Sequence, residues 1–194
     1  MTKQILMLSA LMIVLIGCGS DPTQPATGTA TILLTDAPID LSEVTAVEVT
    51  LDQMVLFGNQ GMVDDEDGME MERPGVTTGE GLTLNLLDFQ NGQTVEIAML
   101  EVPAGNYKKL RMYISEATLV MQDPDDEMLE IRHRIDVPSS KVDIPVAFTV
   151  AGGQDVDVVL DFDAALSVQV NETQGGNKEY ILRPVITPTG INAG

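Results

Sequence analysis

Residues 155–162 have the sequence Asp-Val-Asp-Val-Val-Leu-Asp-Phe, in which apolar residues occupy every second position. A strand turns successive side chains to opposite faces, so this stretch predicts a strand with one face in a core and one in water. The same alternation is present in residues 47–52 and 110–115. Turn sequences such as Asn91-Gly92 and Gly152-Gly153 separate these runs. The chain therefore predicts strands rather than long amphipathic helices.

The alternation and the turn sequences together predict the order of the strands. We expect strands at residues 28–35, 44–57, 82–88, 93–101, 106–121, 127–136, 142–150, 154–163, 166–171 and 178–187. The 106–121 run changes phase near Glu116-Ala117, which predicts a β-bulge. Many short strands at this spacing favour an all-β fold, a two-sheet antiparallel β-sandwich of the immunoglobulin-like or transthyretin-like kind. A barrel is the alternative.

The chain contains one cysteine, Cys18, and its surroundings resemble a bacterial lipoprotein signal peptide. Lys3 precedes an apolar run from Ile5 to Ile16, which is shorter than the roughly 20 residues that a membrane-spanning helix needs. We expect a signal peptide at residues 1–17, lipidation of Cys18, a tether at 18–27 and a β-sandwich domain at 28–190. Gly19, rather than Asp, follows the cysteine, and by resemblance to lipoprotein sorting rules this implies the outer membrane if the cell has one.

The formal net charge of −20 limits the partners of this chain. Such a surface repels nucleic acid and anionic membrane, and it attracts cations. We therefore expect no nucleic-acid partner and contact with a membrane only through the N-terminal lipid. With Cys18 lipidated, no thiol remains for a disulfide, a metal site or a nucleophile.

Residues 58–81 interrupt the strand pattern with acidic residues and glycines, and we expect an acidic mobile loop there. The sequence Asp64-Asp65-Glu66-Asp67-Gly68 is superficially similar to an EF-hand. Alignment on the glycine places Val63 and Pro74 at positions that need oxygen ligands, so the EF-hand interpretation fails.

Three carboxylates are candidate ligands for a metal ion: Asp36, Asp161 and Asp163. For Asp36, which precedes Ala37-Pro38, we favour a role in a turn, with a metal ligand or a buried carboxylate as alternatives. Asp161 and Asp163 are expected on a solvated face, with Arg183 as a structural ion-pair partner of Asp161. A Ca²⁺ site is the alternative for these carboxylates, and we expect no other cofactor.

His133, the only histidine, lies between Arg132 and Arg134. We expect this basic triplet to pair with neighbouring carboxylates on the surface. A His-based zinc site lacks further nitrogen or sulfur ligands, and no Gly-x-Ser-x-Gly elbow is present. The sequence therefore predicts no enzyme, with a hydrolase as a remote alternative.

Several runs, taken in order, resemble one family. They are residues 34–38, 86–92 and 102–107 with Leu110-Arg111, then 160–164 with Ser167, and finally 180–186. The chain resembles, over nearly all of residues 28–188, the bacterial and archaeal lipoprotein domain catalogued as domain of unknown function 4382. The resemblance implies a secreted β-sandwich often carried by lipoproteins, and it implies no activity or catalytic residues. The acidic 58–81 segment departs from the family in length and charge.

These observations predict an envelope lipoprotein that acts as a non-catalytic binding or adhesion module, in the periplasm or facing the cell surface. Its ligand would be a glycan, a protein or another envelope component, because a rigid sandwich presents its loops for recognition. The alternative is a structural or accessory envelope protein whose clustered carboxylates bind Ca²⁺.

Overall fold

The computed structural model describes residues 26–36, 43–58, 81–126, 128–172 and 174–194. The described residues form strands and two short helical segments: β1 Thr27–Thr35, β2 Val44–Gly58, β3 Leu82–Asn85, η1 Leu86–Phe89, β4 Val95–Pro103, β5 Gly105–Gln122, β6 Glu130–Asp136, β7 Lys141–Val150, β8 Asp155–Phe162, α1 Ala164–Ser167, β9 Val168–Glu172, β10 Lys178–Leu182 and β11 Ile186–Ala193. Neither helical segment within these ranges is long and apolar enough to cross a membrane.

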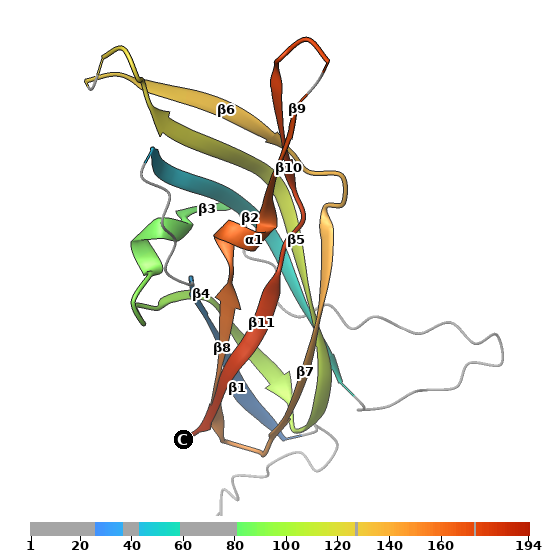
Figure 1. Ribbon diagram of the computed structural model, residues 1–194. Coiled ribbons are helices and arrows are strands. Elements are labelled where there is room, and N and C mark those ends of the chain that lie inside the picture. The colour runs from blue at the N-terminus through green and yellow to red at the C-terminus, as the bar shows by residue number, and fades with distance from the viewer. Residues whose placement is uncertain (1–25, 37–42, 59–80, 127, 173) are drawn as a thin grey trace, which may run out of the picture.

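The strands form two sheets that enclose one core (Figure 1). The small sheet has the order β11-β8-β1-β4. The large sheet has the order β3-β2-β5-β6-β10-β9, and β7 pairs with the first half of β5. The expected all-β, two-sheet architecture is therefore confirmed, and the described strands do not close into the alternative barrel.

The expectation that both sheets are purely antiparallel is wrong. β1 pairs with β8 in parallel, and β10 pairs with β6 in parallel. β1 and β8 run the same way because both start at one end of the sandwich, where the Gly153 N–H donates to the Thr27 carbonyl at 2.7 Å. Alternation of side chains gives the faces of a strand and carries no information on its direction.

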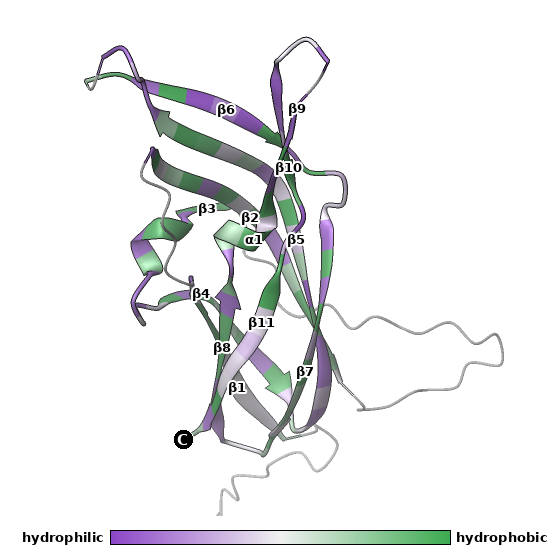
Figure 2. Cartoon of the chain, viewed as in Figure 1, coloured by the Kyte–Doolittle hydropathy of each residue, from purple (hydrophilic) through white to green (hydrophobic). Residues whose placement is uncertain are grey.

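Burial follows the predicted alternation closely. In β8, Val156, Val158, Leu160 and Phe162 are buried, whereas Asp155 is exposed and Asp157 and Asp161 are half-buried. Figure 2 shows a similar alternation of hydropathy along the first half of β2. The buried faces of both sheets meet in one cluster, which is the hydrophobic core.

The predicted bulge in β5 is confirmed. Opposite β5, the register of β2 shifts so that Asp52 and Ser115 are left without a partner position in the ladder. The two side chains lie together instead, with the Ser115 Oγ donating to Asp52 Oδ1 at 2.7 Å. The bulge accounts for the phase change, since β5 keeps its apolar residues on the core side both before and after it.

The predicted turn at Asn91-Gly92 is also confirmed. Both residues have positive φ, 59° and 80° respectively, the left-handed region that Asn and Gly tolerate best. This turn leads from η1 into β4.

The predicted single strand at 178–187 is wrong, because it contains two strands in different sheets. β10 ends at Leu182 in the large sheet, and β11 begins at Ile186 in the small sheet. Pro184 lies between them and has no N–H for a ladder, so the chain leaves one sheet here and joins the other. β11 continues to Ala193, past the expected domain end at residue 190.

Replacing Phe162 with Ala is expected to lower the free energy of unfolding by about 3–5 kcal/mol, because it leaves a cavity under a side chain with 0% exposure. The control, Leu166→Ala, removes a side chain that is 63% exposed and should change that free energy by less than about 0.5 kcal/mol. Urea denaturation followed by circular dichroism measures both. Equally small effects would contradict the central position of Phe162 in the core.

Candidate functional site

A groove opens at the end of the large sheet where two hairpins, β5–β6 and β9–β10, diverge (Figure 1). β6 and β10 pair at only two positions, Tyr180 with Ile135 and Ile181 with Asp136. The groove has a volume of about 780 Å³. Its lining consists of Glu43, Met121, Gln122, Asp123, Pro124, Ile131, His133, Gly176, Asn177, Lys178 and Tyr180.

The floor of the groove is apolar and comes from three strands. Met121 of β5 lies opposite Ile131 of β6, and the next residue on that face of β6 is His133. The His133 ring packs against the Tyr180 ring of β10, with the ring centroids 5.0 Å apart. The Tyr180 hydroxyl lies 3.7 Å from the Met121 sulfur. These contacts hold the floor as a packed surface continuous with the core.

The rim of the groove is polar and comes from three segments. Glu43 precedes β2, Asp123 follows β5, and Lys178 begins β10. The Gln122 N–H donates to the Glu43 carbonyl at 2.9 Å, which joins two of these segments. The groove thus combines an apolar floor with a few polar side chains, the arrangement common in ligand-binding pockets.

The groove lies far from the N-terminal end of the described domain. Ala26 accepts a hydrogen bond from the Ala104 N–H at 2.7 Å, so the chain enters beside the start of β5. Gln122, the last residue of β5, lines the groove. At about 3.3 Å per residue, a strand of this length spans up to about 55 Å. The point of entry and the groove therefore lie at opposite ends of one strand.

The structure brings Asp36 near Asp161 and Asp163, at the junction of β1, β8 and α1. Asp36 is 3% exposed. Its Oδ1 accepts from the Ala164 N–H at 2.9 Å, and its Oδ2 accepts from the Gln90 Nε2 at 3.2 Å. The turn role favoured for Asp36 involves residues 37–42, which lie outside the described residues, whereas its carboxylate binds segments far away in sequence. The buried-carboxylate alternative describes it correctly.

Asp163 and Ser167 form hydrogen bonds at the two ends of α1. Asp163 is the N-cap residue of α1, with its Oδ1 accepting from the Leu166 N–H at 2.8 Å. Ser167 is fully buried and its Oγ accepts from the Val185 N–H at 2.8 Å. The Ser167 carbonyl accepts from the Arg183 N–H, also at 2.8 Å. α1 therefore fixes the segment that crosses from β10 to β11.

Arg183 does not take the place expected for it. Its side chain is exposed, and no ion pair joins it to Asp161 among the residues that the structure describes. Its contribution at this junction comes from the main chain instead, through the hydrogen bond to Ser167. The predicted Arg183–Asp161 pair is therefore wrong in this structure.

The carboxylates at the junction affect one another electrostatically. Burial raises the pKa of Asp36 to about 6, against the lowering effect of its hydrogen bonds to Ala164 and Gln90, and the nearby charges of Asp161 and Asp163 add to the rise. Within the described ranges, no group of three or more His, Cys, Asp or Glu side chains is arranged to hold a metal ion. The carboxylates of Asp36 and Asp163 instead accept hydrogen bonds from the main chain.

The basic triplet on β6 divides between the two faces of the sheet. Arg132 forms an ion pair with Glu48 of β2, as expected for a surface cation. His133 points the other way, into the groove. The association of His133 with Tyr180, Met121 and a groove was not predicted from the sequence. The available signal was the alternating direction of side chains along Ile131-Arg132-His133, which places the histidine on the opposite face of the strand from its arginine neighbours.

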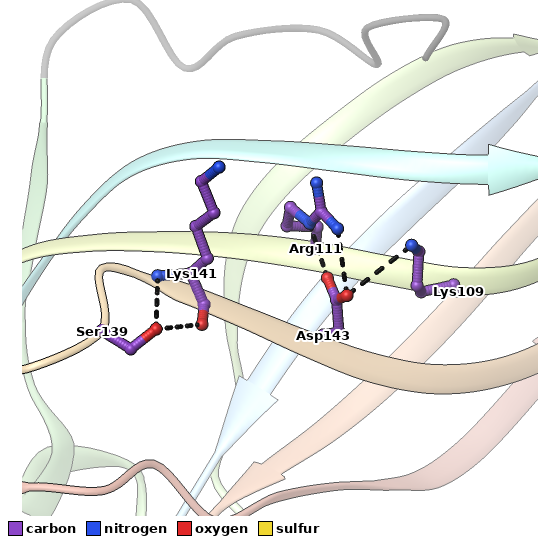
Figure 3. Close-up of polar contacts among 5 residues, drawn as sticks. All are labelled: Lys109, Arg111, Ser139, Lys141 and Asp143. Atoms are coloured by element: carbon purple, nitrogen blue, oxygen red, sulfur yellow. Dashed lines mark hydrogen bonds and ion pairs between the residues drawn. The ribbon is translucent and has the colours of Figure 1, made fainter. Parts of the chain in front are cut away.

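A second charged cluster lies on β5 and β7, away from the groove (Figure 3). Arg111 binds both carboxylate oxygens of Asp143, with Nε–Oδ1 at 2.6 Å and Nη2–Oδ2 at 3.0 Å. Lys109 lies 3.6 Å from Asp143 Oδ2 and 3.9 Å from the centroid of the Phe57 ring. The Arg111 hydrogen bond is the main reason that the pKa of Asp143 falls below its usual value. The cluster stabilises the pairing of β5 with β7.

Two expectations lie outside the described residues. Cys18 and the signal peptide belong to residues 1–25, and nearly all of the acidic 58–81 segment belongs to residues 59–80. Gly58 ends β2, and Gly81 precedes β3.

The contribution of Asp36 to the free energy of unfolding should fall as the pH rises from about 4 to about 6. The folded state keeps the Asp36 proton up to pH about 6, whereas the unfolded state loses it near 3.8, so folding binds a proton between these values. The shift corresponds to about 3 kcal/mol. The variant Asp36→Asn cannot ionise, so its stability relative to the wild type should increase by up to that amount from pH 4 to pH 7.

Urea denaturation at several pH values measures this difference. Asp155→Asn, which alters an exposed carboxylate on β8, is the matched control and should give a much smaller change with pH. If the difference between the wild type and Asp36→Asn is constant over this range, the buried carboxylate does not titrate as stated.

Of the comparisons with known proteins, the one with family models gave a match. The family model described as domain of unknown function (DUF4382) matches residues 27–184, from the start of β1 to just beyond β10. Neither the comparison with curated proteins nor that with solved structures gave a match. Because the family model covers most of the chain, this protein belongs to the DUF4382 family.

Proposed function

We propose that this protein is a lipid-anchored envelope protein that acts as a non-catalytic binding or adhesion module. Its ligand is a glycan, a protein or another envelope component, and the groove at the end of β5 and the start of β10 is the binding site. The immunoglobulin-like or transthyretin-like assignment of the sandwich stays a prediction within this proposal.

The observation that carries the proposal is the position of the groove relative to the N-terminal end of the domain. The chain enters at Ala26, and the groove lies at the other end of β5. If Cys18 is lipidated, the tether holds the Ala26 end toward the membrane. The groove is then presented away from the bilayer, where a binding surface meets its partner.

The contacts of His133 fit a binding role better than a catalytic one. Its ring packs on Tyr180, and no hydrogen bond between described residues joins it to a serine or a carboxylate. A hydrolytic triad needs a histidine oriented by an acid and within reach of a nucleophile. The Ca²⁺ alternative likewise draws no support from the junction carboxylates, which accept main-chain hydrogen bonds.

Replacing Cys18 with Ser is expected to move the protein from the membrane fraction to the soluble fraction, because the anchoring lipid has no sulfur to attach to. Ser20→Ala is the control and should leave the protein in the membrane fraction. Labelling with radioactive palmitate and detergent phase partition measure the outcome. Unchanged labelling and partition of Cys18→Ser would disprove lipid anchoring at this residue.

Replacing Ile131 with Ser should reduce binding by at least about tenfold, because it removes apolar contact from the floor of the groove. Ile131 is 37% exposed, and Ile191, which is 43% exposed on β11, gives a matched control as Ile191→Ser. A glycan array and pull-down of envelope proteins with the full chain measure binding. A wild type that binds nothing, or equal loss in both variants, would contradict a binding site in the groove.

A further inference from the structure

The mouth of the groove carries mostly negative charge. Glu43 and Asp123 line it, and Asp125 and Asp126 lie on the adjoining turn. Lys178 is the lysine of the lining. Carboxylates gathered at the mouth of a concavity attract positively charged groups and repel negatively charged ones. The charge of the groove therefore complements a cationic ligand.

Large apolar side chains are exposed beside the same groove. Met128 is 92% exposed and Leu129 is 55% exposed. Leu129 is fixed opposite Asp123, because the Asp123 N–H donates to the Leu129 carbonyl at 2.9 Å. Both residues lie in the connection between β5 and β6, and they precede Ile131, which lines the groove. A group of exposed apolar residues next to a groove marks an interaction site more often than single ones do.

The aromatic residue in the floor is not available for stacking on a sugar ring. Tyr180 is 7% exposed, and the His133 ring packs against it. The groove thus offers aliphatic and thioether groups to a ligand, with carboxylates around them. Aliphatic side chains and ammonium or guanidinium groups are the matching chemistry, and polypeptides carry both.

We propose that the groove binds a basic, amphipathic polypeptide segment of a partner protein. Apolar side chains of the segment pack on Met121, Ile131 and Leu129, while its lysines and arginines face Glu43 and Asp123. This inference rests on the function proposed above and names the ligand class. The volume of about 780 Å³ accommodates a short segment rather than a folded domain, since it is of the size of ordinary ligand pockets.

The test uses the full chain and two labelled peptides, one of alternating leucine and lysine and one of alternating leucine and glutamate. Fluorescence anisotropy should detect binding of the lysine peptide only. The double variant Glu43→Gln/Asp123→Asn should weaken this binding by at least about tenfold. Asn at position 123 keeps the acceptor for the Asp125 N–H, so the turn is preserved. Circular dichroism and thermal unfolding check that each variant is folded.

The control Asp155→Asn/Asp157→Asn makes the same change of net charge on β8, in the other sheet. It should leave the affinity within about twofold of the wild type. Equal weakening in both double variants would mean attraction to net charge alone and would overturn the proposal. Leu129→Ser should also weaken binding, and an unchanged affinity would overturn the apolar part of the proposal.

A further arm separates this inference from the function on which it rests. Neutral and acidic oligosaccharides are titrated under the same conditions. If they bind in a way that depends on Ile131 and the lysine peptide does not, the groove is a binding site and the peptide inference is wrong. If neither binds, the peptide inference is wrong, and the broader proposal is decided by the glycan array and the pull-down.

Discussion

The architecture depends on one buried carboxylate, that of Asp36. Asp36 directly follows β1, and its carboxylate accepts hydrogen bonds from Ala164, 128 positions away, and from Gln90, 54 positions away. These bonds join β1 to the end of β8 and to the segment after η1. The carboxylate has lost most of its water, so its stability depends on these donors. Ser167 completes the junction by holding the crossing from β10 to β11. Several of the sequence runs that resemble the family thus meet at one point, where their hydrogen bonds join distant segments of this chain.

Features that depend on local interactions could be predicted from the sequence, and features that depend on contacts between distant residues could not. The faces of the strands were predictable because alternation is local, and the bulge at Ser115 was predictable because it changes the local phase. The role of Asp36 was not predictable, because its donors are far away in the chain. A turn before Pro38 is the local explanation for an aspartate, and only the tertiary structure shows that the carboxylate serves a distant helix start.

Neither the direction of the strands nor the groove could be predicted from the sequence, because both depend on how distant segments assemble. A parallel pair and an antiparallel pair bury the same residues, so the alternation of β8 cannot distinguish them. Pro184 is a local signal that a strand ends between β10 and β11. It does not show which sheet each of the two strands joins. The groove exists because β6 and β10 pair at two positions and then separate. Such a geometry comes from the assembly of both hairpins, and neither sequence contains it alone.

The distribution of charge bears on how a generally acidic protein would select the ligand proposed for the groove. The strands of the small sheet, β1, β4, β8 and β11, contain no lysine, arginine or histidine, and the described basic residues lie on the strands of the large sheet or just after β10. Carboxylates alone therefore attract cations over a wide area, which favours encounter and gives little specificity. At the groove, Glu43 and Asp123 lie in the same lining as the exposed Ile131. Under the proposal, a cationic and apolar partner gains both long-range attraction and local apolar burial at this site.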